Sequence, residues 1–175
     1  MSLKYHLCLI VGILLTSNTF AVPPVEVISS CKKGNADGPT VTFTKLEGPY
    51  ASTEEEGCDD HIETTEAGLT YGGISCGTTS FFIINGTRLD SNNAVNNSIN
   101  PAITPNNRIP YTGRWSKIEF DNKAYLCLVM ALSDSGTGAG IPSYYIVENA
   151  YSTVDTPILY FYFFDKDVMP MTMTP

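Results

Sequence analysis

The stretch Ile118-Glu-Phe-Asp121-Asn122-Lys-Ala-Tyr-Leu126 contains two short runs of apolar and aromatic residues that are separated by Asp-Asn. Asp and Asn tolerate the positive φ angles that a two-residue β-hairpin requires. The flanking residues favour extended backbone, because β-branched and aromatic side chains pack well on a pleated surface. The sequence therefore predicts an antiparallel hairpin that turns at Asp121 and Asn122.

Short runs of the same kind recur along the chain, and helical periodicity is almost absent. The predicted strands are Val25–Ile28, Val41–Thr44, Leu69–Tyr71, Ser80–Ile84, Trp115–Phe120, Tyr125–Met130, Tyr144–Val147 and Ile158–Phe164. Two runs, Tyr125–Leu132 and Ile158–Phe164, are apolar at successive positions, which indicates strands that are covered on both faces. We expect a mainly β single domain, an antiparallel sandwich or a barrel-like fold, with room for one short helix on the back of a sheet.

The N-terminus has the features of a secretory signal peptide. Lys4 precedes an apolar run from Leu7 to Leu15. The small residues that a signal peptidase recognises follow, in the stretch that ends at Ala21. This pattern predicts cleavage after Ala21 and export to the periplasm or the extracellular space, because the run is too short to span a bilayer. Residues 22–175 then form the mature domain, with no transmembrane segment. An alternative, lipidation at Cys31, places the cysteine too far beyond the apolar run.

Cleavage removes Cys8 and leaves four cysteines, Cys31, Cys58, Cys76 and Cys127. In an oxidising compartment an even number of cysteines indicates disulfides, here two with three formal connectivities. We favour Cys58 with Cys76, which closes a short loop, and Cys31 with Cys127, which joins the first strand to a central one. No pair has Cys-x-x-Cys spacing, so the sequence predicts no zinc site.

The chain is acidic, with a formal net charge of −8 that becomes −9 when the leader and its Lys4 are removed. Nucleic acids and anionic membrane surfaces would repel such a protein at long range, so neither is an expected partner. Between the predicted strands lies a polar stretch at about 86–113 that is rich in Asn and Pro. It is either a functional loop or an unstructured insertion.

The strongest local charge is the segment Glu54-Glu-Glu-Gly-Cys-Asp-Asp-His-Ile-Glu63, and no Lys or Arg occurs between Lys45 and Arg88. Three interpretations compete: a solvated acidic loop, a cation site, or a docking surface for a basic protein. The alternating carboxylates of an EF-hand loop are absent, so no metal site is predicted. The residues expected to bind a partner are Glu54, Glu55, Glu56, Asp59, Asp60 and Trp115.

Catalytic machinery is not evident. His61 is the only histidine of the mature chain, so a Ser-His-Asp or Cys-His arrangement would have to be built on that one side chain. Disulfide formation would remove the thiol nucleophiles, and the sequence contains no His-Glu-x-x-His helix. We therefore expect no enzyme activity and no cofactor.

Gly113-Arg-Trp115, followed by β-rich sequence, resembles the Gly-x-Trp motif of lipocalins. This resemblance implies a secreted antiparallel barrel that holds a small apolar ligand. In lipocalins the motif lies on the first barrel strand, whereas here much of the predicted sheet precedes it. The preferred interpretation of Trp115 is therefore an aromatic residue of the core or its rim.

The function class that fits these features is an exported, non-catalytic binding protein, such as an inhibitor or immunity protein that recognises a basic protein. One alternative is a small-ligand carrier with a lipocalin-like cup. Another is a structural surface or adhesion subunit, for which the last apolar strand would be a donor segment.

Overall fold

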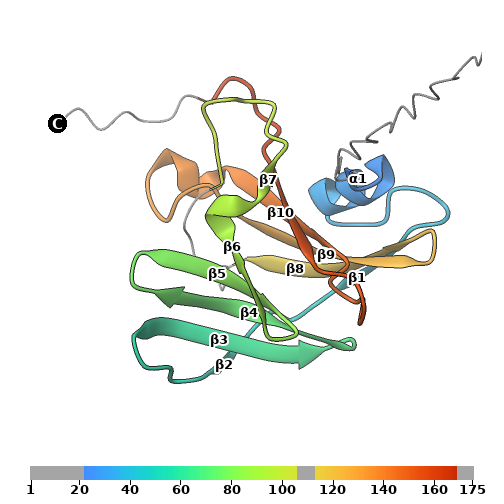
Figure 1. Cartoon of the computed structure of the whole chain (residues 1–175). Helices are drawn as coiled ribbons and strands as arrows, with labels where there is room; N and C mark the ends of the chain where they lie inside the picture. Colours follow the sequence, from blue (N-terminus) through green and yellow to red (C-terminus); the bar gives the residue numbers. More distant parts are fainter. Residues whose placement is uncertain (1–21, 106–112, 169–175) are drawn as a thin grey trace, which may run out of the picture.

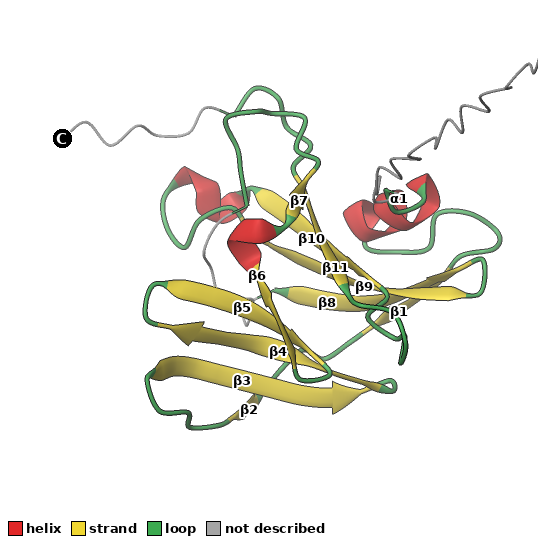
Figure 2. Ribbon diagram, viewed as in Figure 1, coloured by secondary structure: helices red, strands yellow, loops and turns green. Residues whose placement is uncertain are grey.

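The computed structural model describes residues 22–105 and 113–168, so the predicted signal peptide lies outside the described residues. The described chain forms three layers (Figure 1). Helix α1 (Val25–Lys33) lies on one side of a six-stranded sheet, and a five-stranded sheet lies on the other. Strands are the predominant element (Figure 2), which confirms the predicted mainly β fold with one α-helix.

The six-stranded sheet has the order β1-β8-β9-β10-β11-β7, and all neighbours are antiparallel except β11 and β7. Its strands are β1 (Thr42–Lys45), β7 (Val95–Asn96), β8 (Arg114–Phe120), β9 (Lys123–Ala131), β10 (Pro142–Glu148) and β11 (Ile158–Tyr162). The predicted hairpin joins β8 to β9. Asp121 and Asn122 have φ angles of 49° and 59°, as a two-residue turn of this kind requires.

The five-stranded sheet is an antiparallel meander in chain order, β2-β3-β4-β5-β6. Its strands are β2 (Ala51–Ser52), β3 (Cys58–Glu66), β4 (Leu69–Cys76), β5 (Thr79–Ile84) and β6 (Thr87–Asp90). Tight turns such as Asn85-Gly86, with φ angles of 48° and 79°, connect the last four strands.

Residues 106–112 of the polar stretch at about 86–113 lie outside the described residues, and the part that the structure describes is only partly a loop. It begins with β6, continues through a 3-10 turn, η1 (Ser91–Asn93), and includes β7. The sequence pattern missed these strands because they are short and carry Arg, Asp and Asn in place of a clear apolar alternation.

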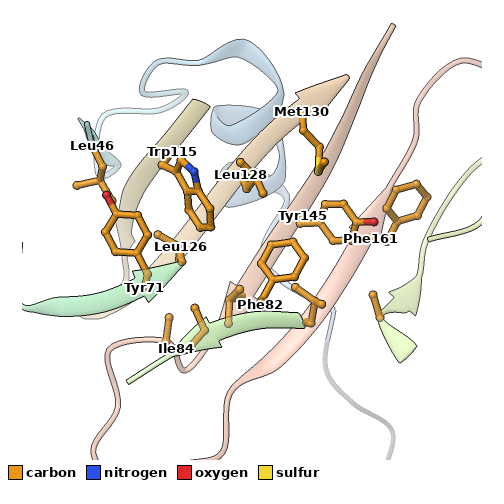
Figure 3. Packing of buried hydrophobic residues seen from close by; sticks show 14 of the residues in the cluster. Leu46, Tyr71, Phe82, Ile84, Trp115, Leu126, Leu128, Met130, Tyr145 and Phe161 are labelled. Carbon is orange, nitrogen blue, oxygen red and sulfur yellow. The ribbon is translucent and has the colours of Figure 1, made fainter. Parts of the chain in front are cut away.

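Aromatic side chains fill the space between the two sheets (Figure 3). Tyr71 of the five-stranded sheet packs on Trp115 of the six-stranded sheet, with ring centroids 4.9 Å apart. Phe82 makes the same kind of contact with Tyr145, also at 4.9 Å. Such pairs stabilise the sandwich beyond the burial of their apolar area.

The prediction that β9 and β11 are covered on both faces is confirmed. Leu126 and Leu128 of β9 belong to the cluster between the sheets, whereas Tyr125 and Cys127 belong to a second cluster that includes Val27 of α1. Both strands have a neighbour on each side in the sheet. Burial on both faces explains their continuous apolar sequence.

The predicted strand Val25–Ile28 is wrong, because these residues begin helix α1. Pro24 precedes the helix without interrupting it, and Gly34 ends it with a φ angle of 71°. Its buried residues, Val27, Ser30 and Cys31, lie on one helical face. Packing against the sheet therefore overrides the strand preference of β-branched residues.

Both predicted disulfides are present, Cys31–Cys127 and Cys58–Cys76. The first joins α1 to β9, so the expectation that it starts from a strand is wrong while the pairing is confirmed. The second joins β3 to β4. Each sheet therefore carries one covalent link to a neighbouring element.

Candidate functional site

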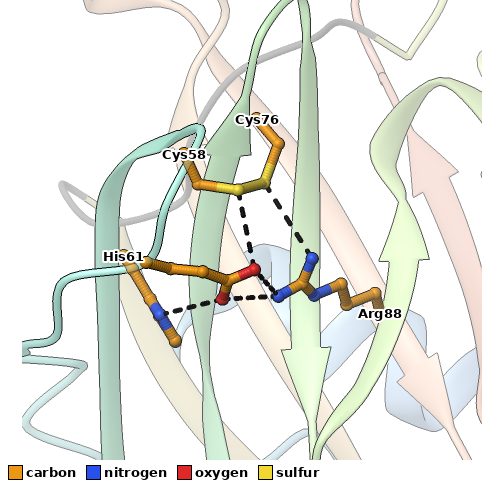
Figure 4. Close-up of a disulfide and its surroundings, with 5 residues drawn as sticks. Cys58, His61, Cys76 and Arg88 are labelled. Atoms are coloured by element: carbon orange, nitrogen blue, oxygen red, sulfur yellow. Dashed lines mark hydrogen bonds and ion pairs between the residues drawn. A yellow bond between two sulfur atoms is a disulfide. The ribbon is translucent and has the colours of Figure 1, made fainter.

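The acidic segment singled out in the sequence is largely a strand. Its second half forms β3, and Cys58 lies directly opposite Cys76 in the antiparallel pairing with β4. The disulfide between these cysteines crosses from one strand to the other at the end of the hairpin (Figure 4). Asp, Glu and Lys are rare in strands, so the pattern concealed β3 from sequence reasoning.

Glu55 precedes β3 and makes a bidentate ion pair with Arg88 of β6. The Nη2 atom of Arg88 lies 2.5 Å from Oε1 and 2.6 Å from Oε2 of Glu55 (Figure 4). The hydrogen bond from Arg88 holds the pKa of the Glu55 carboxyl below its usual range. This ion pair connects the turn before β3 to the opposite edge of the sheet, and the Arg88 side chain passes the disulfide on the way, with its Nη1 atom 4.0 Å from Sγ of Cys76.

His61 lies between two carboxylates. Its Nε2 atom is 2.9 Å from Glu63, its Nδ1 atom is 3.5 Å from Glu55, and 13% of its side chain is exposed. A break in the β3–β4 register between Asp59 and Ile62, with Asp60 at a φ angle of 51°, places the imidazole in this position. The interactions of the ring within the described residues are all with carboxylates.

Glu66, at the other end of β3, is also part of the internal structure. Its Oε2 atom accepts hydrogen bonds from the Tyr71 hydroxyl at 2.8 Å and from the Glu47 amide at 3.0 Å. Burial raises the pKa of Tyr71, and the hydrogen bond to Glu66 raises it further. This carboxylate ties the end of β3 to the chain between β1 and β2.

The remaining carboxylates form a separate group, the acidic edge, which we define as Glu54, Glu56, Asp59 and Asp60. All four residues are exposed, and no ion pair within residues 22–105 and 113–168 involves any of them. The structure thus divides the predicted partner-binding residues. Four of the carboxylates are exposed and have no ion-pair partner among the described residues, whereas the fifth, Glu55, is neutralised by Arg88.

Trp115 does not lie with the acidic residues. It is on β8 of the other sheet, 2% exposed, and packed between Tyr71 at 4.9 Å and Phe82 at 6.3 Å. This position agrees with the interpretation of Trp115 as a core aromatic residue. The Gly-x-Trp resemblance to lipocalins therefore falls on an inner strand of a two-sheet sandwich whose interior is filled by side chains.

The sequence did not identify Arg88 as a partner of the acidic segment. Thirty-three residues separate it from Glu55 along the chain. The one available signal was that Arg88 is the first cation after a long stretch without Lys or Arg. This observation makes Arg88 a candidate partner, but it does not show which of the carboxylates Arg88 binds.

The chemistry open to this region is limited. In the part of the chain that the structure describes, one cluster has metal-ligand spacing, namely Glu55 with Cys58 and Cys76. The two sulfur atoms are bonded to each other, so neither is available as the thiolate that a metal would require. What the region offers is negative charge: one carboxylate held by an ion pair with Arg88, and the exposed carboxylates of the acidic edge.

No helix within the described residues is long and apolar enough to cross a membrane. The two disulfides are compatible with an exported protein.

Comparisons of this chain with protein-family models, with curated proteins and with solved structures find no match.

Proposed function

We propose that this chain is an exported, non-catalytic binding protein that recognises a basic protein partner through the acidic edge. The observation that carries the proposal is a set of four exposed carboxylates that make no ion pair with any residue the structure describes, held beside a disulfide that links β3 to β4. A partner with a complementary cluster of Lys and Arg would supply the missing positive charge.

The interactions that hold the acidic edge in place favour a role in binding a partner over a purely solvated loop. The disulfide, the Arg88–Glu55 ion pair and the contact between His61 and Glu63 constrain the backbone on either side of it. A surface that is already ordered loses little conformational entropy when it binds. Its negative field would also accelerate the encounter with a basic protein.

This combination fits an inhibitor or immunity protein better than the two alternatives. A carrier with a cup between its sheets would need an open interior, but Tyr71, Phe82 and Trp115 occupy that space. A donor segment for assembly would need a strand that can leave its sheet. The last strand, β11, is buried between β10 and β7.

The test is a comparative pull-down with mass spectrometry from the fluid or periplasm of the source cells. The neutralised variant carries Glu54→Gln, Glu56→Gln, Asp59→Asn and Asp60→Asn, and Asn tolerates the positive φ angle at position 60. The control variant removes the same number of charges at exposed positions outside β3, by Asp121→Asn, Asp155→Asn, Asp165→Asn and Asp167→Asn.

We expect the wild type and the control to capture the same basic protein, and the neutralised variant to lose it. With the purified partner, neutralisation should slow association and weaken its dependence on salt. Equal capture by both variants, or capture of an acidic protein only, would contradict the proposal. Thermal melts of all three proteins show whether the fold is retained, since exposed like charges contribute little to stability.

A further inference from the structure

A pocket of about 310 Å³ opens beside the C-terminal end of α1, where the helix no longer covers the six-stranded sheet. We call it the basic groove. Its lining comes from α1, β1, β8 and β9, and it includes Lys33, Phe43, Lys45, Glu47, Arg114 and Val129. The acidic edge belongs to the five-stranded sheet, on the other side of the six-stranded sheet from α1 (Figure 1).

Positive charge converges on this groove in a chain that has 18 acidic and only 10 basic residues. Lys45 ends β1 and pairs in register with Ser116 of β8. Arg114 stands two residues before Ser116, so it lies on the same face of β8. Both side chains are exposed, and neither makes an ion pair within the described residues.

Two other charged residues, Lys33 and Glu47, also line the groove. Lys33, in the last turn of α1, is 2.7 Å from Asp37, which neutralises it. Glu47 is the carboxylate in the lining. Lys45 and Arg114 therefore provide the positive charge that is open to a ligand.

Part of the lining is apolar, including Phe43 and Val129. Val129 is buried, and Phe43 packs against the same hydrophobic cluster that includes Val27 and Cys31 of α1. The volume of the groove is at the lower end of the range for small-molecule sites, which combine apolar walls with a few polar groups that set orientation. The groove thus offers one apolar wall and one cationic end.

We propose that the basic groove binds a small organic anion with an apolar body. The guanidinium of Arg114 and the ammonium of Lys45 bind the acidic group, and Phe43 and Val129 contact the apolar part. Arg is suited to this role because its planar fork donates two parallel hydrogen bonds to an oxyanion. The site differs in ligand, charge and location from the surface proposed to bind a basic protein.

The probe for this site is 8-anilinonaphthalene-1-sulfonate, an aromatic sulfonate whose fluorescence rises in apolar surroundings. Its neutral counterpart, N-phenyl-1-naphthylamine, has the same ring system without the anionic group. The test variant is Lys45→Gln with Arg114→Gln. The control variant is Lys123→Gln with Lys166→Gln, which removes two exposed cations elsewhere.

We expect saturable binding of the sulfonate to the wild type and the control, with a Kd at least about tenfold higher for the test variant. The neutral probe should bind more weakly to the wild type, and the test substitutions should leave its Kd unchanged. Absence of saturable binding to the wild type, or equal sulfonate affinity in the test and control variants, would overturn the proposal. Equal binding of both probes to the wild type would overturn it as well, because the cations would then have no role.

Discussion

At the scale of single residues, Gly72 shows how closely β3 and β4 approach each other. It lies opposite Glu63, and a Cβ at this position would be 2.0 Å from the Ile62 carbonyl oxygen. Replacing Gly72 by Ala should therefore shift the backbone of β3 and lower the free energy of unfolding by about 1–3 kcal/mol. Urea denaturation of the oxidised protein measures this change. Gly140→Ala is the control, because no atom lies within 4 Å of the position of its Cβ; equal stability of the two variants would show that the strands are not in this close contact.

At the scale of elements, the β8–β9 hairpin depends on two successive residues with positive φ, Asp121 at 49° and Asn122 at 59°. Replacing both by Val should lower the free energy of unfolding by about 1 kcal/mol or more, since β-branched residues do not accept this conformation. The matched variant Asp121→Asn with Asn122→Gly should be at least as stable as the wild type, because Asn-Gly is the preferred pair for such turns. Urea midpoints of the three proteins provide the comparison, and a stable Val-Val variant would place the turn elsewhere.

At the scale of the whole molecule, the two disulfides differ in the length of chain that they close. Cys31–Cys127 has a sequence separation of 96 and Cys58–Cys76 one of 18. If the disulfides act mainly on the entropy of the unfolded chain, removing the first pair by Cys→Ala should cost roughly 1.5 kcal/mol more than removing the second. Burial adds to this difference, because Cys31 and Cys127 are 1% and 0% exposed. Urea unfolding without reductant measures both losses, and a larger loss on removing Cys58–Cys76 would contradict the expected order.

Features that depend on local chemistry were available from the sequence alone. Asp121-Asn122 predicts its turn because few residues accept positive φ. The apolar runs of β9 and β11 predict burial on both faces, since a strand with one solvated face alternates. The cysteines predict two disulfides, although spacing by itself left three connectivities open.

Only the tertiary structure decided which charges of the acidic segment are free. Arg88 comes from a strand far along the chain and forms an ion pair with Glu55, whereas Asp59 and its exposed neighbours make no ion pair within residues 22–105 and 113–168. The same holds for Val25–Ile28, a strand by local preference that becomes a helix because it packs on the sheet. In both cases the deciding contact joins residues distant in sequence. For Val25–Ile28, the free energy of packing on the sheet exceeds the preference of the residues for a strand. For Glu55, the pattern of neighbouring residues gives no sign of the ion pair with Arg88.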